Sequence, residues 1–221
     1  MRGNLEHIEY KKAVEFLMPR HYSGRKPQIS KAFGWFCDGE LKAVCTFGKP
    51  ASSHLCWGIC GKEHERQVYE LNRLCRLEGW DEPLSQFVSL CLRELKKKNW
   101  IIVSYSDTGM SHNGYIYQAC NFIYTGKTKE RTVFFTEGNK HSRHHDKEKQ
   151  GKYRKVRTSK HRYVYFCANS KRQKKEWLRA LNYEIEPYPK GENKNYKLGT
   201  FQQPIIVVDK RKDVTLESIG K

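Results

Sequence analysis

Apolar and polar positions along the first fifty residues predict one helix followed by a β-hairpin. Residues 9–18 place apolar side chains at helical spacing, and Pro19 ends the pattern because it cannot continue a helix. Residues 31–37 and 41–47 are apolar runs, and the Asp38-Gly39 pair between them is a strong signal for a hairpin turn. The amino-terminal part therefore predicts a helix and two antiparallel strands.

The middle of the chain predicts a strand, a helix and a buried central strand. Residues 67–77 mix apolar and polar positions as a strand does, and Asp81-Glu82-Pro83 then starts an amphipathic helix that runs to about Lys98. Residues 100–105 form a short continuous apolar run, which is typical of a strand buried on both faces. The end of such a strand is where α/β proteins place their chemistry.

The carboxyl-terminal half predicts shorter elements around a long basic loop. They are a helix over 112–120, strands over 122–124, 131–136 and 161–167, a helix over 170–181 and a strand over 204–208. We expect the strands over 131–136 and 161–167 to pair as a hairpin whose tip is the basic loop. The chain outside these elements and beyond Pro187 predicts little regular structure.

The order of these elements predicts an α/β fold with a mixed sheet. It matches the acetyltransferase-like (GNAT) arrangement, in which the central strands splay apart and leave a cleft for the donor. We expect a catalytic domain over residues 1–182, which includes a basic insertion at 137–160, and a carboxyl-terminal extension over 183–221.

The charge of the chain points to a polyanionic partner. Lys and Arg outnumber Asp and Glu by 42 to 24, which gives a formal net charge of +18. The basic excess concentrates in residues 127–175, which favours nucleic acid over a merely solubilising surface. The side chains that we expect to contact phosphates are Lys140, Arg143, Lys152, Arg154 and Arg157.

The apolar segments and the cysteines indicate in which cellular compartment we expect the protein. No apolar run approaches the ~20 residues that a membrane span needs, and the first residues lack the apolar core of a signal peptide. We expect no membrane partner. The eight cysteines lie in apolar segments, which favours reduced thiols in a cytoplasm over disulfides. A zinc site at His54, Cys56 and Cys60 is a weaker alternative, since no CxxC pair occurs.

The segment over residues 104–124 holds an unusual density of polar and aromatic groups around two glycines. Asp107 follows the predicted central strand, where it can serve as a base or a metal ligand. A capped turn explains part of the segment, but not its imidazole, amides and tyrosine together. The candidates for substrate binding here are Ser104, His112, Asn113 and Asn121, and the aromatic rings would stack an extruded base.

Two earlier segments carry further candidates. His21 and Tyr22 follow the first helix and offer a nitrogen ligand and a phenol, or they merely anchor the loop. Arg73 lies in a predicted strand and can grip a phosphate or carboxylate with two prongs, with Asn72 beside it for substrate. A buried ion pair between Glu70 and Arg73 is the alternative.

Several collinear motifs resemble the Mom family of bacteriophage DNA-modification proteins, roughly over residues 9–126. These motifs are His21-Tyr22-Ser23, Ala32-Phe33-Gly34-Trp35, Phe47-Gly48-Lys49-Pro50-Ala51-Ser52, Glu70-Leu71-Asn72-Arg73-Leu74, Ser104-Tyr105-Ser106-Asp107 and His112-Asn113-Gly114-Tyr115-Ile116-Tyr117-Gln118-Ala119.

The resemblance implies a GNAT-related enzyme in the cytoplasm of a bacterial host. Such an enzyme converts adenine in double-stranded phage DNA to N6-carbamoylmethyladenine and thereby protects it from host restriction. The resemblance also implies that Arg73 is functional, and that His21, Tyr22, Asp107 and Tyr117 serve the active site as iron ligands.

The donor is open between acetyl-CoA and an activated glycine such as glycyl-tRNA. The turn over 76–81 departs from the glycine-rich pattern with which GNAT enzymes bind the coenzyme A pyrophosphate, because Asp81 replaces its last small residue. Glu78 and Glu82 also place negative charge at the helix start, which repels an anion. A carbamoylmethyl group contains a CH2, a carbonyl and an amide nitrogen, and glycine supplies all three.

Alternative functions are a non-catalytic nucleic-acid-binding protein and an ordinary GNAT acyltransferase. Under the first, the basic loop does the work and residues 104–124 are structural. Whether that loop contacts DNA or tRNA, and whether the chain forms a homodimer, are left open by the residues.

Overall fold

The hairpin predicted at Asp38-Gly39 is present and begins the main sheet. In the computed structural model, which describes residues 3–135, 153–191 and 205–208, strands β2 (Lys31–Cys37) and β3 (Glu40–Gly48) pair antiparallel. Asp38 and Gly39 both have positive φ, 51° and 77°, as a tight two-residue turn requires. Strand β1 (Asn4–His7), which the pattern does not reveal, pairs with the free edge of β2.

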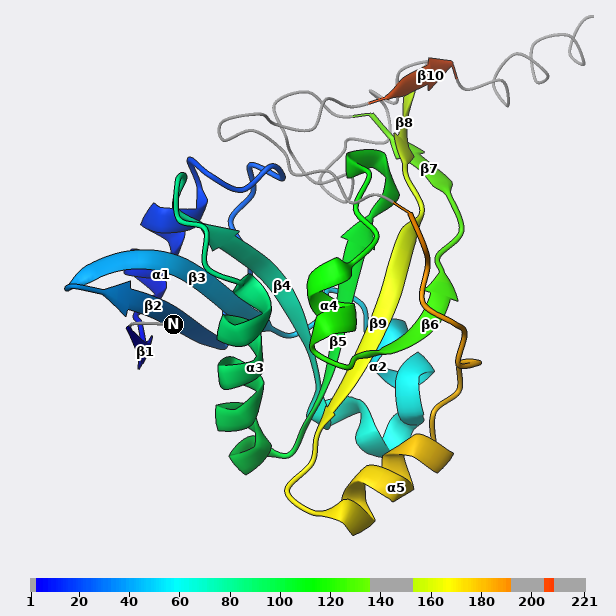
Figure 1. Cartoon of the computed structure of the whole chain (residues 1–221). Helices are drawn as coiled ribbons and strands as arrows, with labels where there is room; N and C mark the ends of the chain where they lie inside the picture. The colour runs from blue at the N-terminus through cyan, green and yellow to red at the C-terminus, as the bar shows by residue number, and fades with distance from the viewer. Residues whose placement is uncertain (1–2, 136–152, 192–204, 209–221) are drawn as a thin grey trace, which may run out of the picture.

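Seven strands form the main sheet in the order β1-β2-β3-β4-β5-β9-β6 (Figure 1). Strands β4 (Val68–Arg76) and β5 (Trp100–Asp107) are parallel, whereas the other neighbours are antiparallel. Both lie where the sequence predicts strands, and β5 is central and largely buried. This confirms the mixed α/β fold and the element order of the acetyltransferase-like arrangement.

Helices cover both faces of this sheet. Helix α3 (Leu84–Leu95) buries Phe87, Val88, Cys91, Leu92 and Leu95 against one face, as its amphipathic pattern predicts. On the other face, α2 (Ser53–Cys60), which was not predicted, and α5 (Lys171–Arg179) pack together around Ile59 and Trp177. Helix α1 (Tyr10–Leu17) packs on Ala32 of β2 and Val44 of β3.

The predicted pairing of residues 131–136 with 161–167 is wrong. Strand β9 (Lys160–Cys167) lies instead between β5 and β6 (Ile123–Lys127), with Tyr163 opposite Ser104. The physical reason is its burial: most of β9 is inaccessible from both faces, so it needs a central position. Strand β7 (Arg131–Phe134) is more exposed and pairs outside the main sheet.

A second sheet of three strands stands at the carboxyl end of β5 (Figure 1). It consists of β7, β8 (Tyr153–Arg157) and β10 (Ile206–Val208), with β8 in the middle. Residues 153–157 of the predicted basic insertion are therefore strand rather than loop, and β10 lies where the tail predicts one.

Strands β4 and β5 separate part of the way along their length. Residues Val68 to Leu71 of β4 pair with Ile101 to Ser104 of β5, and the pairing stops there although both strands continue. Short 3-10 turns complete the connections, at Lys62–Gln67, Lys96–Lys98 and Thr108–Met110. No helix among the described residues is both long enough and apolar enough to cross a membrane.

Candidate functional site

A cavity of about 700 Å³ opens where β4 and β5 separate. Its walls are the loop after α1, the carboxyl half of β4, the end of β5, helix α4 (Tyr115–Ala119) and strand β8. These segments meet at one end of the molecule (Figure 1). Of the sequence-predicted site residues, the cavity brings together His21, Tyr22, Asn72, Arg73, Asp107, His112, Tyr117 and Arg157.

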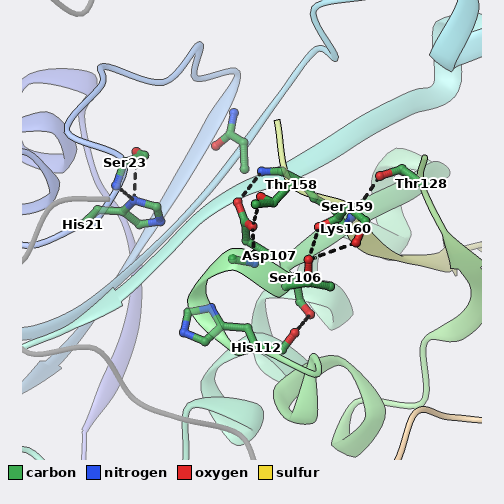
Figure 2. A network of polar contacts seen from close by, with 12 residues as sticks. His21, Ser23, Ser106, Asp107, His112, Thr128, Thr158, Ser159 and Lys160 are labelled. Carbon is green, nitrogen blue, oxygen red and sulfur yellow. Dashed lines mark hydrogen bonds and ion pairs between the residues drawn. The ribbon is translucent and has the colours of Figure 1, made fainter. Parts of the chain in front are cut away.

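His21 is a neutral imidazole in this cavity. Its Nδ1 lies 2.9 Å from Ser23 Oγ, and the backbone N–H of Ser23 donates to the same nitrogen (Figure 2). Burial first, and then the charge of Arg73, lower the pKa of His21 to about 3. Because Nδ1 accepts a hydrogen bond, the neutral ring carries its proton on Nε2, which is therefore a donor.

Tyr22 joins His21 to His112. The Tyr22 ring stacks on His21 at 4.5 Å between centroids and meets the His112 ring edge-on at 5.7 Å. Burial and the charge of Asp107 raise the pKa of Tyr22 to about 12. The cavity thus presents three uncharged or weakly basic rings, a surface on which a flat heterocycle can stack.

Asp107 is 2% exposed and makes three polar contacts (Figure 2). Its Oδ1 accepts from the backbone N–H of Gly109 at 2.9 Å and from Thr158 Oγ1 at 2.6 Å. Its Oδ2 forms an ion pair with Lys160 Nζ at 3.0 Å. Asp107 thereby ties the end of β5 to the connection between β8 and β9.

The four residues that the resemblance implies as iron ligands all line the cavity, and protein groups already contact some of their polar atoms. Both oxygens of Asp107 have partners within the protein, and Nδ1 of His21 accepts the backbone N–H of Ser23. Within residues 3–135, 153–191 and 205–208, no three His, Cys, Asp or Glu side chains are grouped as metal ligands would be. The same finding applies to the zinc alternative at His54, Cys56 and Cys60. None of the eight cysteines, which all lie in the described part of the chain, forms a disulfide, and Cys56 and Cys60 are buried.

Tyr117 of α4 lines the cavity. Its ring packs 5.3 Å from both Phe122 and Tyr163, and burial raises the pKa of its hydroxyl, with the Ser104 hydrogen bond opposing that shift. Ser104 itself donates to the carbonyl of Leu71 at 2.9 Å and holds the last paired residues of β4 and β5 together.

Arg73 and Asn72 of β4 form hydrogen bonds with the loop after α1 and with β3. Arg73 donates to the carbonyls of Asn72 at 2.6 Å and Arg25 at 3.2 Å, which holds the loop after α1 against β4. The Asn72 amide accepts from Thr46 at 2.7 Å and donates to the carbonyl of Gln28 at 2.7 Å. Both atoms of this amide are thus engaged within the protein.

The remaining predicted residues divide by position. Asn113 and Asn121 are not part of the cavity wall, and Asn121 has a positive φ of 59° just after α4. Arg154 packs on the Phe134 ring and donates to Thr132, which makes it part of the small sheet. Lys140, Arg143 and Lys152 lie outside the described residues.

Glu70, which the sequence suggests only as an ion-pair partner, faces the cavity from β4. Burial raises the pKa of its carboxyl, and the charges of Arg73 and Lys160 only partly oppose that shift. Such a carboxylate is a better base at neutral pH than an exposed one. Thr158 and Lys160 were also missed, because they reach Asp107 through a strand pairing that no local pattern announces.

Positive charge dominates the cavity wall. Its acidic members are Glu70, Glu78 and Asp107, and its basic members are Arg20, Arg25, Arg73, Arg76, Lys155, Arg157 and Lys160. An electropositive cleft of this kind raises the local concentration of anionic substrates.

A model of the Mom protein family matches residues 3–190 of the chain. No curated protein matches this chain. Among solved structures, an N-acetyltransferase from Staphylococcus aureus Mu50 aligns with a TM-score of 0.47 and 11% identity, over 76% of this chain and 99% of its own. A putative acetyltransferase from Salmonella typhimurium, solved with its cofactor acetyl-CoA, aligns with a TM-score of 0.49 and 7% identity, over 77% and 96%.

Proposed function

This chain belongs to the Mom protein family, and from that premise we propose that it is a transferase that modifies the amino group of adenine in double-stranded DNA. The product that we propose is N6-carbamoylmethyladenine, which would protect the DNA from host restriction. The observation that carries the proposal is the cavity between β4 and β5, where aromatic rings and a carboxylate of raised pKa lie within a cationic wall.

The cavity suits a base taken out of the helix. Its volume of about 700 Å³ falls within the range of about 300 to 1,000 Å³ that is usual for ligand sites. Enzymes that do chemistry on a base extrude it and stack it between side chains. The rings of His21, Tyr22 and His112 would stack the adenine, and the His21 Nε2–H would donate to a ring nitrogen.

The reaction that we propose is attack of adenine N6 on the carbonyl carbon of an activated glycine. The N–C bond forms, Glu70 removes one proton from N6, and the leaving alcohol of the glycyl ester takes the electron pair of the broken C–O bond together with that proton. Tyr22 stays protonated at neutral pH and would donate a hydrogen bond to the carbonyl oxygen in the tetrahedral intermediate. The glycyl amide so formed is isomeric with the carbamoylmethyl product, so reaching that product needs a further isomerisation without net oxidation. In it the bonds from N6 to the carbonyl carbon and from the CH2 to its amino nitrogen break, and bonds from N6 to the CH2 and from the amino nitrogen to the carbonyl carbon form.

The deciding experiment is mass analysis of DNA nucleosides from bacteria that make the protein. We expect a deoxyadenosine heavier by one carbamoylmethyl group with the wild type, distinguished from the isomeric glycyl amide by its fragments, and its loss in Glu70→Gln, which keeps the side-chain volume but removes the base. Exposed His54 on α2 provides the control, since His54→Asn leaves the cavity unchanged. Unmodified adenine from a wild-type protein that binds DNA would instead support a non-catalytic nucleic-acid-binding protein.

Isotope labelling separates the two donors. Cells fed labelled glycine should place the label in the modified nucleoside, whereas label entering from acetate and not from glycine would identify acetyl-CoA.

A further inference from the structure

The small sheet holds two like charges directly opposite one another. Arg131 of β7 and Arg157 of β8 are register partners in this antiparallel pair. Like charges at such positions destabilise a sheet, because the side chains stand close together on one face. An anion bound between the two guanidinium groups would offset this repulsion.

Two further cations lie near this pair. Lys155 is two residues from Arg157 on the same strand and so shares its face. Lys155, Arg157 and Arg25 of the loop after α1 all line the cavity. None of these four residues forms an ion pair with a carboxylate among the residues that the structure describes.

The electrostatics agree with this geometry. Burial lowers the pKa of Lys155, and the charges of Arg25 and Arg157 lower it further. Burial likewise lowers the pKa of Arg157, with Arg131 and Arg25 adding to the shift. The charges of Arg25, Arg131 and Arg157 thus each lower the pKa of a neighbouring cation, which agrees with their lying close together.

We propose that Arg25, Arg131, Lys155 and Arg157 form a binding site for a phosphodiester of the DNA strand whose base enters the cavity. Guanidinium groups bind phosphate oxygens in pairs, and several cations around one anion suit a phosphate better than a single carboxylate. The inference rests on the proposed function, because the modified base connects the backbone phosphate to the cavity.

The position of the site favours the acceptor strand over a phosphate of the donor. In Figure 1 the turn between β4 and α3, where Glu78 and Glu82 favour a cationic or uncharged donor group over a phosphate, lies to the left of the gap between β4 and β5. Strand β8 lies to the right of that gap, above the end of β5. The two sides of the cavity thus offer separate places for donor and DNA.

The test is the salt dependence of binding to a fluorescent DNA duplex, measured by anisotropy with the full-length protein. Arg157→Gln and Lys155→Gln should each weaken binding and flatten the plot of log K against log salt by roughly 0.9 for each phosphate that is no longer neutralised. Lys98→Gln in the exposed turn before β5 removes the same charge far from the cavity and should leave the slope unchanged. Unchanged slopes for both cavity variants would overturn the proposal.

Two further measurements distinguish a failure of the proposed phosphate site from a failure of the proposed function. Arg131→Gln should leave the free protein as stable as the wild type or more so in thermal melting, since it relieves repulsion from Arg157; a clear loss of stability would argue for a structural role. If Arg157→Gln weakens binding to tRNA but not to the duplex, the site serves RNA and our proposal is wrong. The binding slopes stand whether or not adenine becomes modified, and modification with unchanged slopes would remove the site but keep the function.

Discussion

His21 shows at the level of one residue how burial sets chemistry. Its Nδ1 is occupied by Ser23, and burial lowers its pKa to about 3. An unfolded chain takes up this proton near pH 6.5, whereas the folded protein resists it. The folded pKa is depressed, so acidification favours the unfolded state from about pH 6.5 downward.

We therefore expect the free energy of unfolding to fall below pH 6.5 by up to about 1.4 kcal/mol per pH unit from this group. Urea unfolding between pH 7 and pH 4.5 measures it, and His21→Asn should lose less stability over this range. His54→Asn, which changes an exposed histidine, is the control. Equal pH dependence of wild type and His21→Asn would contradict the assigned environment of His21.

The pKa of Glu70 is shifted in the opposite direction to that of His21. Because burial raises its pKa, the folded protein holds this proton more tightly than the unfolded chain does. The stability that protonation contributes is present at low pH and is lost as pH rises through the raised pKa. Glu70→Gln should accordingly stabilise the fold at neutral pH.

The same carboxyl should control the rate of modification. We expect the rate to rise with pH through the raised pKa of Glu70, because only the carboxylate accepts the proton of adenine N6. In Glu70→Gln this limb should disappear along with a loss of roughly 10²-fold or more in rate. A single-turnover assay with a DNA duplex and the labelled donor gives both values, and an unaltered pH profile would exclude Glu70 as the base.

Gly114 shows at the level of elements how α4 is positioned. This residue precedes the helix with φ of 77°, and a Cβ there would lie 2.4 Å from the Tyr163 ring of β9. Gly39 has the same φ of 77° in the hairpin turn, but a Cβ at that position would meet no heavy atom within 4 Å. Substitutions at these two glycines therefore distinguish the cost of backbone strain, which both share, from the cost of a steric collision, which only Gly114 would have.

Gly39→Ala should cost about 1 to 2 kcal/mol of folding free energy from backbone strain alone. Gly114→Ala carries the same strain plus the collision with a buried ring, so its cost should be clearly larger. Urea denaturation of both variants measures the difference. Equal losses would show that the approach of α4 to β9 is looser than described.

Asp107 joins elements as well as lining the cavity. Its contacts to Thr158 and Lys160 fasten the end of β5 to the chain that runs from β8 into β9. Asp107→Ala leaves Thr158 and the Gly109 N–H without a charged acceptor and should cost roughly 1 to 3 kcal/mol, because water replaces the carboxylate beside Lys160, whose side chain is 41% exposed. A double-mutant cycle with Lys160→Gln measures the share of the ion pair.

The metal content of the same variants tests the ligand role implied by the family resemblance. We expect Asp107→Ala to lose stability and activity without a change in bound iron relative to wild type. Loss of stoichiometric iron at unchanged stability would restore Asp107 as a ligand.

The whole molecule distributes its net charge of +18 unevenly. Seven cations against three carboxylates line the cavity, and the small sheet adds Arg131 beside them. The excess positive charge is thus concentrated where the proposed chemistry occurs, and it suits a polyanion that must be steered and then held by its backbone.

Local pattern determined most elements of this fold. The hairpin at Asp38-Gly39, the amphipathic face of α3, the apolar run of β5 and the capping Ser170 of α5 each depend on residues within a few positions of one another. Such signals are readable because helix and strand periodicity are properties of the chain itself. Short elements such as β1 and α2 gave weaker signals and were missed.

Tertiary structure decided the pairings and the chemistry of the site. Nothing in the pattern of β9 reveals that it inserts between β5 and β6, because strand partners are chosen by burial across the whole sheet. That insertion brings Lys160 to Asp107, and the separation of β4 from β5 brings Glu70 together with His21 and Tyr22 in one cavity. The sequence by itself determined which residue types are present and which elements carry them, whereas their pKa values, partners and roles depend on distances that only the folded chain sets.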